Sequence, residues 1–464
     1  MQDVTAQVAA WAAGLSLDAV PASVVAKAKL LLADITGIAL LTRQESESTP
    51  SLVGALRALE LDRGRFRCIG DPAGYAAPAA ALLTGAMAHS IDFDDTHVAA
   101  LHHPSAPVIP AALVAAQVAG ASGRELLAGI VVGVEVMCRI GVALGPGSHY
   151  GKGFYATPTC GAFGATAAAA RVLGLSATQV EHAFGTALSE TSGSGQFHVN
   201  GAWTKRFQVG HAAACGLTAA ALAQAGFTGA SEALEGASGF YRLYSNEARP
   251  ERTVQDLGQQ WEIARIGFKP YPACRGMHAA VDAALALYVR HQVPSAEIAS
   301  ATVGLCRQSL DLVGWPEDRK QQPTSVIEAQ FSAPFGVAVG LRHGRLGWSD
   351  YATELCDPTI RALMSRIHSV HDADVEALFP SQVAGRVTIT TQSGQSFSEL
   401  VPIPRGEPEN PLSEAELRAK FDGLVLPYLG SDGATALFAW ILDLEHQPGL
   451  DTFFDLALPR IGGT

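Results

Sequence analysis

The feature that most constrains this chain is a long succession of Ala-rich helical segments that fills its first half. Between Thr5 and about Gly226, apolar residues recur with helical spacing, and Gly, Pro and Ser separate the segments. The segments 107–121 and 131–144 are apolar on every face, so we expect them at the centre of a helical bundle. The full set of expected helices, with no strand among them, is 22–41, 76–89, 107–121, 125–144, 159–173, 177–188 and 205–225.

The pattern changes after about Gly267, where segments of β type first appear. Strands are expected at 301–306, 386–391 and 396–402, and helices at 278–291, 325–341, 414–421 and 433–444. The last two strands should form a hairpin around Gln392-Ser393-Gly394. We therefore predict a mainly α protein: a large all-α helical domain, 1–267 and 405–464, interrupted by a smaller α+β lid domain, 268–404. A joint between an insertion and its host is a common place for a ligand cleft.

Length and charge exclude several classes of function. A chain of 464 residues can form two domains with apolar cores of their own, which permits an enzyme. The formal net charge of −12, with no basic stripe, argues against nucleic-acid binding. The sequence opens without a basic leader, and no apolar run reaches the ~18 uncharged residues of a membrane span. We therefore expect a cytoplasmic protein without membrane contact.

One polar cluster stands out against this apolar background. The stretch 89–103 holds three carboxylates and four imidazoles. Asp92 and Asp95 share a helix face if the preceding helix runs on, and His102 and His103 return after a short loop. A carboxylate beside an imidazole fixes its tautomer and raises its pKa, as a general acid or base near neutral pH requires. The alternatives are a solvated helix end, or a metal ion held by mixed Asp and His ligands, although no typical metal-binding spacing is present.

A second set of candidate residues is cationic. Lys205, Lys269 and Arg275 lie beside turn-rich backbone in a chain that has few cations. Pro270 and Pro272 stiffen the segment that carries Lys269 and Arg275. Because Arg binds carboxylates through a bidentate fork, we expect these side chains to hold the carboxylates of a small ligand. A solvated surface is the alternative for each of them.

Four motifs together resemble the MmgE/PrpD family. They run in order along nearly the whole chain: His89-Ser90-Ile91-Asp92-Phe93-Asp94-Asp95-Thr96 with His103-Pro104-Ser105, Gly153-Phe154 with Thr157-x-Thr159-x-Gly161, Thr204-Lys205 with Gly210, and Lys269-x-Tyr271-Pro272. The family includes 2-methylcitrate dehydratase, cis-aconitate decarboxylase and iminodisuccinate epimerase. The resemblance implies a homodimer whose protomers have an all-α domain and an α+β lid. It also implies action on small polycarboxylates without a metal or organic cofactor.

The same resemblance assigns residues to the site and also shows departures. The positions that line the cleft in relatives are Asp92, Thr96, His103, Lys205 and Lys269. His103 would be the leading proton donor or acceptor, and the lysines would hold substrate carboxylates. Tyr155, Gln208 and Cys274 each stand where relatives carry a histidine. A phenol with a pKa near 10 does not share a proton at neutral pH as imidazole does, although it can donate a hydrogen bond or protonate a carbanion.

The sequence therefore predicts a cofactor-independent lyase, a dehydratase or decarboxylase that acts on a small di- or tricarboxylate. In this hypothesis His103 with Asp92 moves a proton next to a carboxylate, and Tyr155 acts on the other side. The cations stabilise the enolate-like charge that builds up. The predicted substrate-binding residues are Thr96, His102, Lys205, Lys269 and Arg275.

Three alternatives stay open at this point. An epimerase or isomerase in the same cleft would return the proton to the opposite face of the substrate. A metal-dependent prenyl-type enzyme would hold Mg²⁺ on Asp92, Asp94 and Asp95, but the chain has no second acidic motif for a diphosphate. A non-catalytic family member would bind a tricarboxylate without turning it over.

Overall fold

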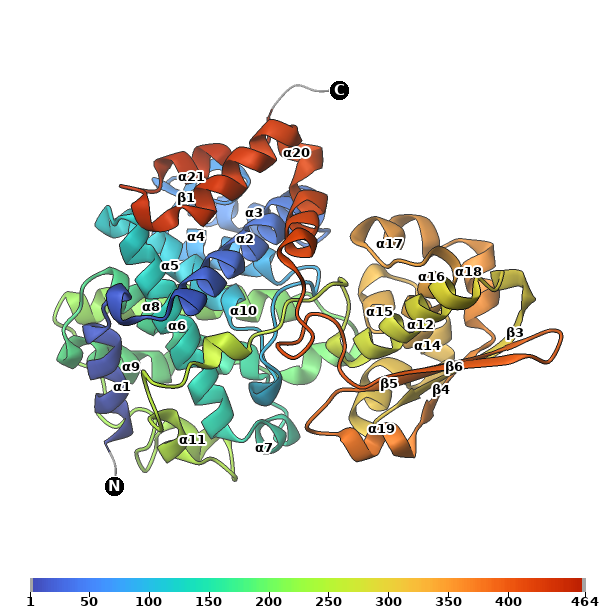
Figure 1. The fold of residues 1–464 in the computed structure, drawn as a ribbon. Coiled ribbons are helices and arrows are strands. Elements are labelled where there is room, and N and C mark those ends of the chain that lie inside the picture. Colours follow the sequence, from blue (N-terminus) through green and yellow to red (C-terminus); the bar gives the residue numbers. More distant parts are fainter. Residues whose placement is uncertain (1–2, 461–464) are drawn as a thin grey trace. The chain divides into compact units, whose positions relative to one another are not determined.

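The structure is a computed structural model that describes residues 3–460, and it divides into two compact units (Figure 1). Unit 1 comprises Met1–Ser90, Asp94–Gly267 and Ser413–Thr464, and unit 2 comprises Ile91–Phe93 and Phe268–Leu412. Helices dominate the described residues, and the named strands form one sheet of two strands and one of four. The prediction of a mainly α protein with a smaller α+β part is confirmed.

Unit 1 is built from helices that follow one another along the chain (Figure 1). Its helices are α1 (Val4–Gly14), α2 (Ala22–Glu45), α3 (Thr49–Ala58), α4 (Ala77–Ala88), α5 (Ser105–Ala119), α6 (Gly123–Leu144), α7 (Pro146–Gly151), α8 (Ala156–Val172), α9 (Ala177–Glu190), α10 (Thr204–Gln224), α11 (Phe240–Tyr244), α20 (Glu414–Leu442) and α21 (Asp451–Leu456). All helices predicted between 22 and 225 are present, with ends that differ by a few residues. As expected, α5 and α6 are almost entirely buried, and both pack against α8.

The expectation of a purely helical first half is wrong at one place. A short antiparallel hairpin joins β1 (Phe66–Cys68) to β2 (Asp71–Tyr75). These strands are three and five residues long, and Pro72 and Gly74 interrupt the second. Such short segments show no alternation of apolar and polar residues, so no pattern in the sequence indicated them.

Two helices, α6 and α20, are long and apolar enough to cross a membrane by length and composition alone. In α6, 94% of the apolar window is buried inside the protein, as in the core helix of a globular fold. In α20, 50% of the window is buried, and Gly430 has a non-helical backbone that breaks the helix. The two helices predicted at 414–421 and 433–444 are therefore the two parts of one kinked element.

Unit 2 contains a four-stranded sheet in the order β4-β3-β5-β6. β3 (Ile298–Leu305) runs parallel to β4 (Ile367–His371) and antiparallel to β5 (Gly385–Thr391), and β5 forms the predicted hairpin with β6 (Ser396–Val401). The helices of this unit are α12 (His278–His291), α13 (Arg307–Ser309), α14 (Glu317–Gln321), α15 (Val326–Gln330), α16 (Ala333–His343), α17 (Trp348–Glu354), α18 (Pro358–Met364) and α19 (Ala373–Leu378). α12 packs on the sheet and against α16, around a buried apolar core.

Two predictions for unit 2 need correction. The single helix predicted at 325–341 is two helices, because Phe331 leaves the helical backbone and Ser332 caps α16, which has Pro334 in its first turn. The strand β4 was not predicted. It has histidines at positions 368 and 371, and only two of its five residues are buried, so it lacks the apolar pattern of a core strand.

Candidate functional site

The loop that follows α4 contains most of the polar cluster. α4 ends at Ala88, and Asp92 has a left-handed backbone with φ of 52°, which a short polar side chain tolerates. The helix therefore does not continue through the cluster, and the expectation that Asp92 and Asp95 share a helix face is wrong. Asp92 belongs to unit 2, whereas Asp94 and Asp95 belong to unit 1.

A buried chain of hydrogen bonds joins Asp94, His89 and Tyr155. Nδ1 of His89 lies 2.7 Å from Oδ2 of Asp94, and Nε2 of His89 lies 2.8 Å from the Tyr155 hydroxyl. The side chains of His89 and Asp94 are fully buried, and Tyr155 is 4% exposed. Because an ionised carboxylate can only accept, Nδ1 carries the proton of the neutral ring and Nε2 accepts the phenol proton.

His103 lies at the edge of the same group. The centroid of its ring is 4.9 Å from that of His89, and its Nδ1 lies 3.6 Å from Oδ2 of Asp94. Nδ1 also lies 3.0 Å from the backbone oxygen of Asp95, which can only accept, so Nε2 is the basic nitrogen of the neutral ring. The His103 side chain is 15% exposed, and a small molecule can reach it more easily than His89. We predicted Asp92 as the partner of His103, whereas the structure places Asp94 beside it.

Asp95 is hydrogen-bonded to the first residue of α5. Its Oδ2 accepts a hydrogen bond of 2.9 Å from the hydroxyl of Ser105, the first residue of that helix. Its Oδ1 has no hydrogen-bond partner among residues 3–460. Burial raises the pKa of the Asp95 carboxyl well above its usual range, and the charge of Asp94 raises it further. Asp95 therefore accepts a proton more readily than an ordinary aspartate.

In unit 2, Lys269 and Asp92 lie together. Lys269 is fully buried, and its Nζ donates a hydrogen bond of 2.8 Å to the backbone oxygen of Asp92. The same nitrogen lies 3.4 Å from Oδ1 of Asp92. The side-chain amide of Gln330 donates to the backbone oxygens of Ile91 and Pro272, so the loop 91–93 is fixed to the segment that carries Lys269.

Arg275 has several partners inside unit 2. Its Nε donates to Oε1 of Glu407 over 2.7 Å, and its Nη1 donates to Nδ1 of His278 over 3.1 Å. His278 in turn donates from Nε2 to the backbone oxygen of Ala273. Burial lowers the pKa of His278 well below its usual range, and the charge of Arg275 lowers it further. These contacts hold the turn 273–278 together, and the binding of a substrate carboxylate by Arg275 stays a prediction.

The remaining predicted binding residues lie in unit 1. His102 is buried and donates from Nε2 to the backbone oxygen of Met137 over 3.3 Å, and burial lowers its pKa well below its usual range. Lys205 lies in the first turn of α10 and is partly buried. Thr96 is 6% exposed, and its hydroxyl has no hydrogen-bond partner in the described part of the chain.

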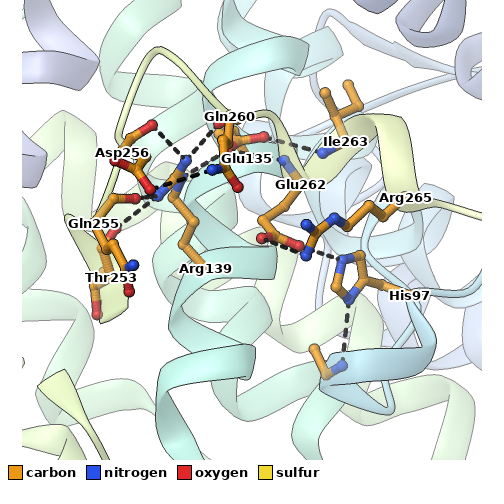
Figure 2. Close-up of polar contacts among 11 residues, drawn as sticks. His97, Glu135, Arg139, Thr253, Gln255, Asp256, Gln260, Glu262, Ile263 and Arg265 are labelled. Carbon is orange, nitrogen blue, oxygen red and sulfur yellow. Dashed lines mark hydrogen bonds and ion pairs between the residues drawn. The ribbon is translucent and has the colours of Figure 1, made fainter. Parts of the chain in front are cut away.

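A network of buried charges holds the segment that precedes Gly267 (Figure 2). Arg139 pairs with Glu135 on α6 over 2.6 Å and donates to four backbone oxygens between 253 and 260. Glu135 accepts hydrogen bonds from the backbone N–H groups of residues 262 and 263. Burial raises the pKa of the Glu135 carboxyl, and the charge of Arg139 opposes that rise. The network therefore ties this long loop to the central helix of unit 1.

His97 contacts this network of buried charges and not Asp94. Nε2 of His97 lies 3.0 Å from Oε2 of Glu262 (Figure 2). Next to it, Thr96 and Gly267 form an antiparallel bridge through both of their backbone N–H groups, over 2.9 and 2.8 Å. Of the four imidazoles in the polar cluster, His89 and His103 are therefore the two that contact Asp94.

The group can also be considered as a metal site. His89, Asp94 and His103 offer ligand atoms that lie within 4.8 Å of one another. In the neutral rings, however, the nitrogens nearest Asp94 carry protons, because each faces an acceptor oxygen. A metal ligand must present a lone pair instead. With neutral rings hydrogen-bonded in this way, the same three residues form an acid–base group.

His89 and Asp94 were not among the predicted catalytic residues. Both lie in the motif that carried the family resemblance, but spacing does not show which of three aspartates faces which imidazole. Tyr155 was predicted, and it reaches His89 from the N-cap of α8, 66 residues away in sequence. Of the other departures, Gln208 bonds the backbone of Ser194, and Cys274 is partly buried.

Comparison with known proteins places the whole chain in one family. The MmgE/PrpD N-terminal domain model matches residues 6–253, and the C-terminal domain model matches residues 271–444. A cis-aconitate decarboxylase-like protein of Aspergillus oryzae is 27% identical over 96% of this chain and 95% of its own length. The cis-aconitate decarboxylase of Aspergillus terreus is 29% identical over 98% and 95%, and that of Mus musculus 30% identical over 79% and 75%. This chain belongs to the MmgE/PrpD family.

Proposed function

We propose that this protein is a cofactor-independent lyase that acts on a small di- or tricarboxylate. The observation that carries the proposal is the buried group in which Asp94 contacts two imidazoles, one of them bonded to a phenol. Relatives named cis-aconitate decarboxylase support the substrate class. Loss of carbon dioxide or of water would both use such a group.

His103 is the residue we assign to proton transfer at the substrate. Its Nδ1 is held by the Asp95 carbonyl, so Nε2 takes or gives the proton. In a dehydration, the base removes the proton next to a carboxylate, the electron pair forms the double bond, and an acid protonates the leaving hydroxyl. In a decarboxylation, carbon dioxide leaves, the bonding electron pair stays on the carbon, and an acid protonates it. Tyr155 is proposed as the second group in either reaction.

The substrate carboxylates are proposed to bind the lysines. Lys269 is a buried cation whose ammonium group is oriented by Asp92, and Lys205 lies at the start of a long helix. The buried hydroxyl of Thr96 can donate a further hydrogen bond. Cations in a water-poor site stabilise the negative charge that develops next to a carboxylate. Asp92, which we predicted as catalytic, acts in this proposal by holding Lys269.

The variant His103→Gln tests the proposal. We would incubate it and the wild type with a panel of short di- and tricarboxylates and follow the substrates by NMR. Because a general acid or base contributes ~10²-fold or more, the variant should lose at least that factor in kcat. His446→Gln is the matched control, because the His446 side chain is 73% exposed and its ring pairs with Asp443, outside the polar cluster. Unchanged turnover in His103→Gln would reject this role for His103.

An epimerase is a second candidate, because His103 and Tyr155 are two acid–base groups that could act on opposite faces of one carbon. Exchange of substrate hydrogen with solvent, with no change in substrate mass, would favour it.

The expected homodimer and cytoplasmic location stay predictions, which sedimentation and cell fractionation can test. Full activity after EDTA treatment is expected for an enzyme that needs no metal ion.

A further inference from the structure

The Tyr155 hydroxyl belongs to a hydrogen-bonded chain whose other members, His89 and Asp94, have fully buried side chains. Tyr155 itself is 4% exposed and is hydrogen-bonded to His89. We infer that Asp94 and His89 form a proton relay for Tyr155, so that the phenol exchanges protons with the substrate on behalf of the buried imidazole. This inference rests on the proposed function and adds two positioning residues to it.

The geometry gives each atom of the relay one role. Both ring nitrogens of His89 have a partner within 2.8 Å, one a carboxylate and the other a hydroxyl. With Nδ1–H directed at Asp94, the Nε2 lone pair faces the phenol. The order carboxylate, imidazole, hydroxyl is the arrangement by which a buried acid holds an imidazole in the tautomer that takes a hydroxyl proton.

The surroundings fix the direction of the phenol. The Tyr155 ring packs edge-on against Phe197, with 5.1 Å between centroids, and lies 6.4 Å from the ring of Tyr150. Its backbone N–H donates to the oxygen of Gly193. The titratable groups that contact His89 include Asp94, His103 and Tyr155. Burial strengthens the hydrogen bonds of such a chain, because little water competes for them.

The proton balance of the relay is simple. In the donating direction His89 starts as an imidazolium, the Tyr155 proton goes to the substrate, and the Nε2 proton passes to the phenol oxygen. The step ends with neutral His89, its Nδ1 proton still on the ring, and Tyr155 again protonated. In the accepting direction the same transfers run in reverse. Asp94 stays a carboxylate throughout and stabilises the imidazolium.

The relay gives a tyrosine access to protons at neutral pH. A phenol alone has a pKa near 10 and is a poor base at pH 7. Coupled to His89, it passes on a proton held by an imidazole, whose ordinary pKa of about 6.5 suits exchange at that pH. Tyr155 can in this way act as an acid–base group without being ionised in the resting protein.

A double-mutant cycle tests the relay by activity. Tyr155→Phe and His89→Gln should each lower kcat by about 10²-fold with a small change in KM, because the relay acts on the reacting atoms. The double variant should be no slower than the slower single variant, because either change alone breaks the relay. Effects that multiply would overturn the inference. Tyr241→Phe is the control, since that buried hydroxyl bonds Thr253 in another part of unit 1.

A second measurement needs no substrate. In ¹⁵N-histidine NMR spectra of the intact protein, the His89 signal, assigned by its loss in His89→Gln, should show a proton on Nδ1, in the neutral ring as in the imidazolium. Asp94→Asn should switch it to Nε2–H, because the new amide donates to Nδ1. An Nε2–H ring in the wild type would overturn the relay even in an active enzyme. The expected tautomer in a protein that turns over no substrate would reject the proposed function and leave only the hydrogen-bond arrangement of Asp94, His89 and Tyr155 supported.

Discussion

At the scale of single residues, the acceptor beside each histidine decides what that histidine can do. His102 and His149 donate to backbone oxygens and are buried, and burial lowers the pKa of both. They therefore stay neutral at physiological pH, and their role is to pack inside unit 1. His89 and His103 contact the carboxylate of Asp94, which stabilises a protonated ring. This difference separates His102 and His149 from His89 and His103, which both contact Asp94.

The buried His149 should make the free energy of unfolding depend on pH. Burial lowers its pKa to about 4, so it stays neutral in the folded protein at pH values where the unfolded chain, with a pKa of 6.5, binds a proton. Below about pH 6.5 the unfolded chain binds a proton that the folded protein does not, so the free energy of unfolding falls. As the pH falls from 6.5 towards 4, this loss amounts to about 3 kcal/mol. In His149→Gln, urea unfolding should depend less on pH across this window. Parallel pH profiles for wild type and variant would contradict it.

The sequence indicated the polar cluster but not the partner of each residue in it. Asp92, Asp94 and Asp95 are close in sequence, yet they contact Lys269, His89 and Ser105 respectively. The left-handed backbone at Asp92 redirects the chain between them. Residue spacing cannot reveal such a turn, because it depends on what the rest of the fold places on either side.

At the scale of elements, the long helices of unit 1 were predictable because each is apolar over several turns and many carry a local start signal. Ser122 with Glu125 and Ser176 with Gln179 form capping boxes at the starts of α6 and α9. The strands β1, β2 and β4 were not predictable, because they are short and only partly buried. Their conformation comes from pairing with another strand, which a single segment does not encode.

The contact between α4 and α10 gives a prediction at this scale. A Cβ atom on Gly210 would lie 2.2 Å from the backbone oxygen of Leu82, so Gly210→Ala must push the helices apart. We expect a loss of about 1–3 kcal/mol in the free energy of unfolding and lower activity, because His89 caps α4. Gly54→Ala is the control, since no atom lies within 4 Å of a Cβ there. Equal stability of the two variants in urea would contradict this reading of the contact.

At the scale of the whole molecule, the chain leaves unit 1 and returns to it. The sequence pattern changes from helical to mixed near Gly267, and the longer segment of unit 2, Phe268–Leu412, begins there. The other segment of unit 2, Ile91–Phe93, is three residues long and shows no sequence pattern of its own. Because of it, the polar loop contributes Asp92 to one unit and Asp94 to the other.

The measurement that tests the central claim most directly is the fate of a tricarboxylate incubated with the wild-type protein in heavy water. The account predicts a product lighter by carbon dioxide or by water. For decarboxylation, it also predicts deuterium on the carbon that takes up the proton, seen by NMR and mass spectrometry. Two results would contradict the assignment as a lyase. One is a substrate that exchanges hydrogen for deuterium but loses neither carbon dioxide nor water. The other is that every di- and tricarboxylate tested binds and stays unchanged.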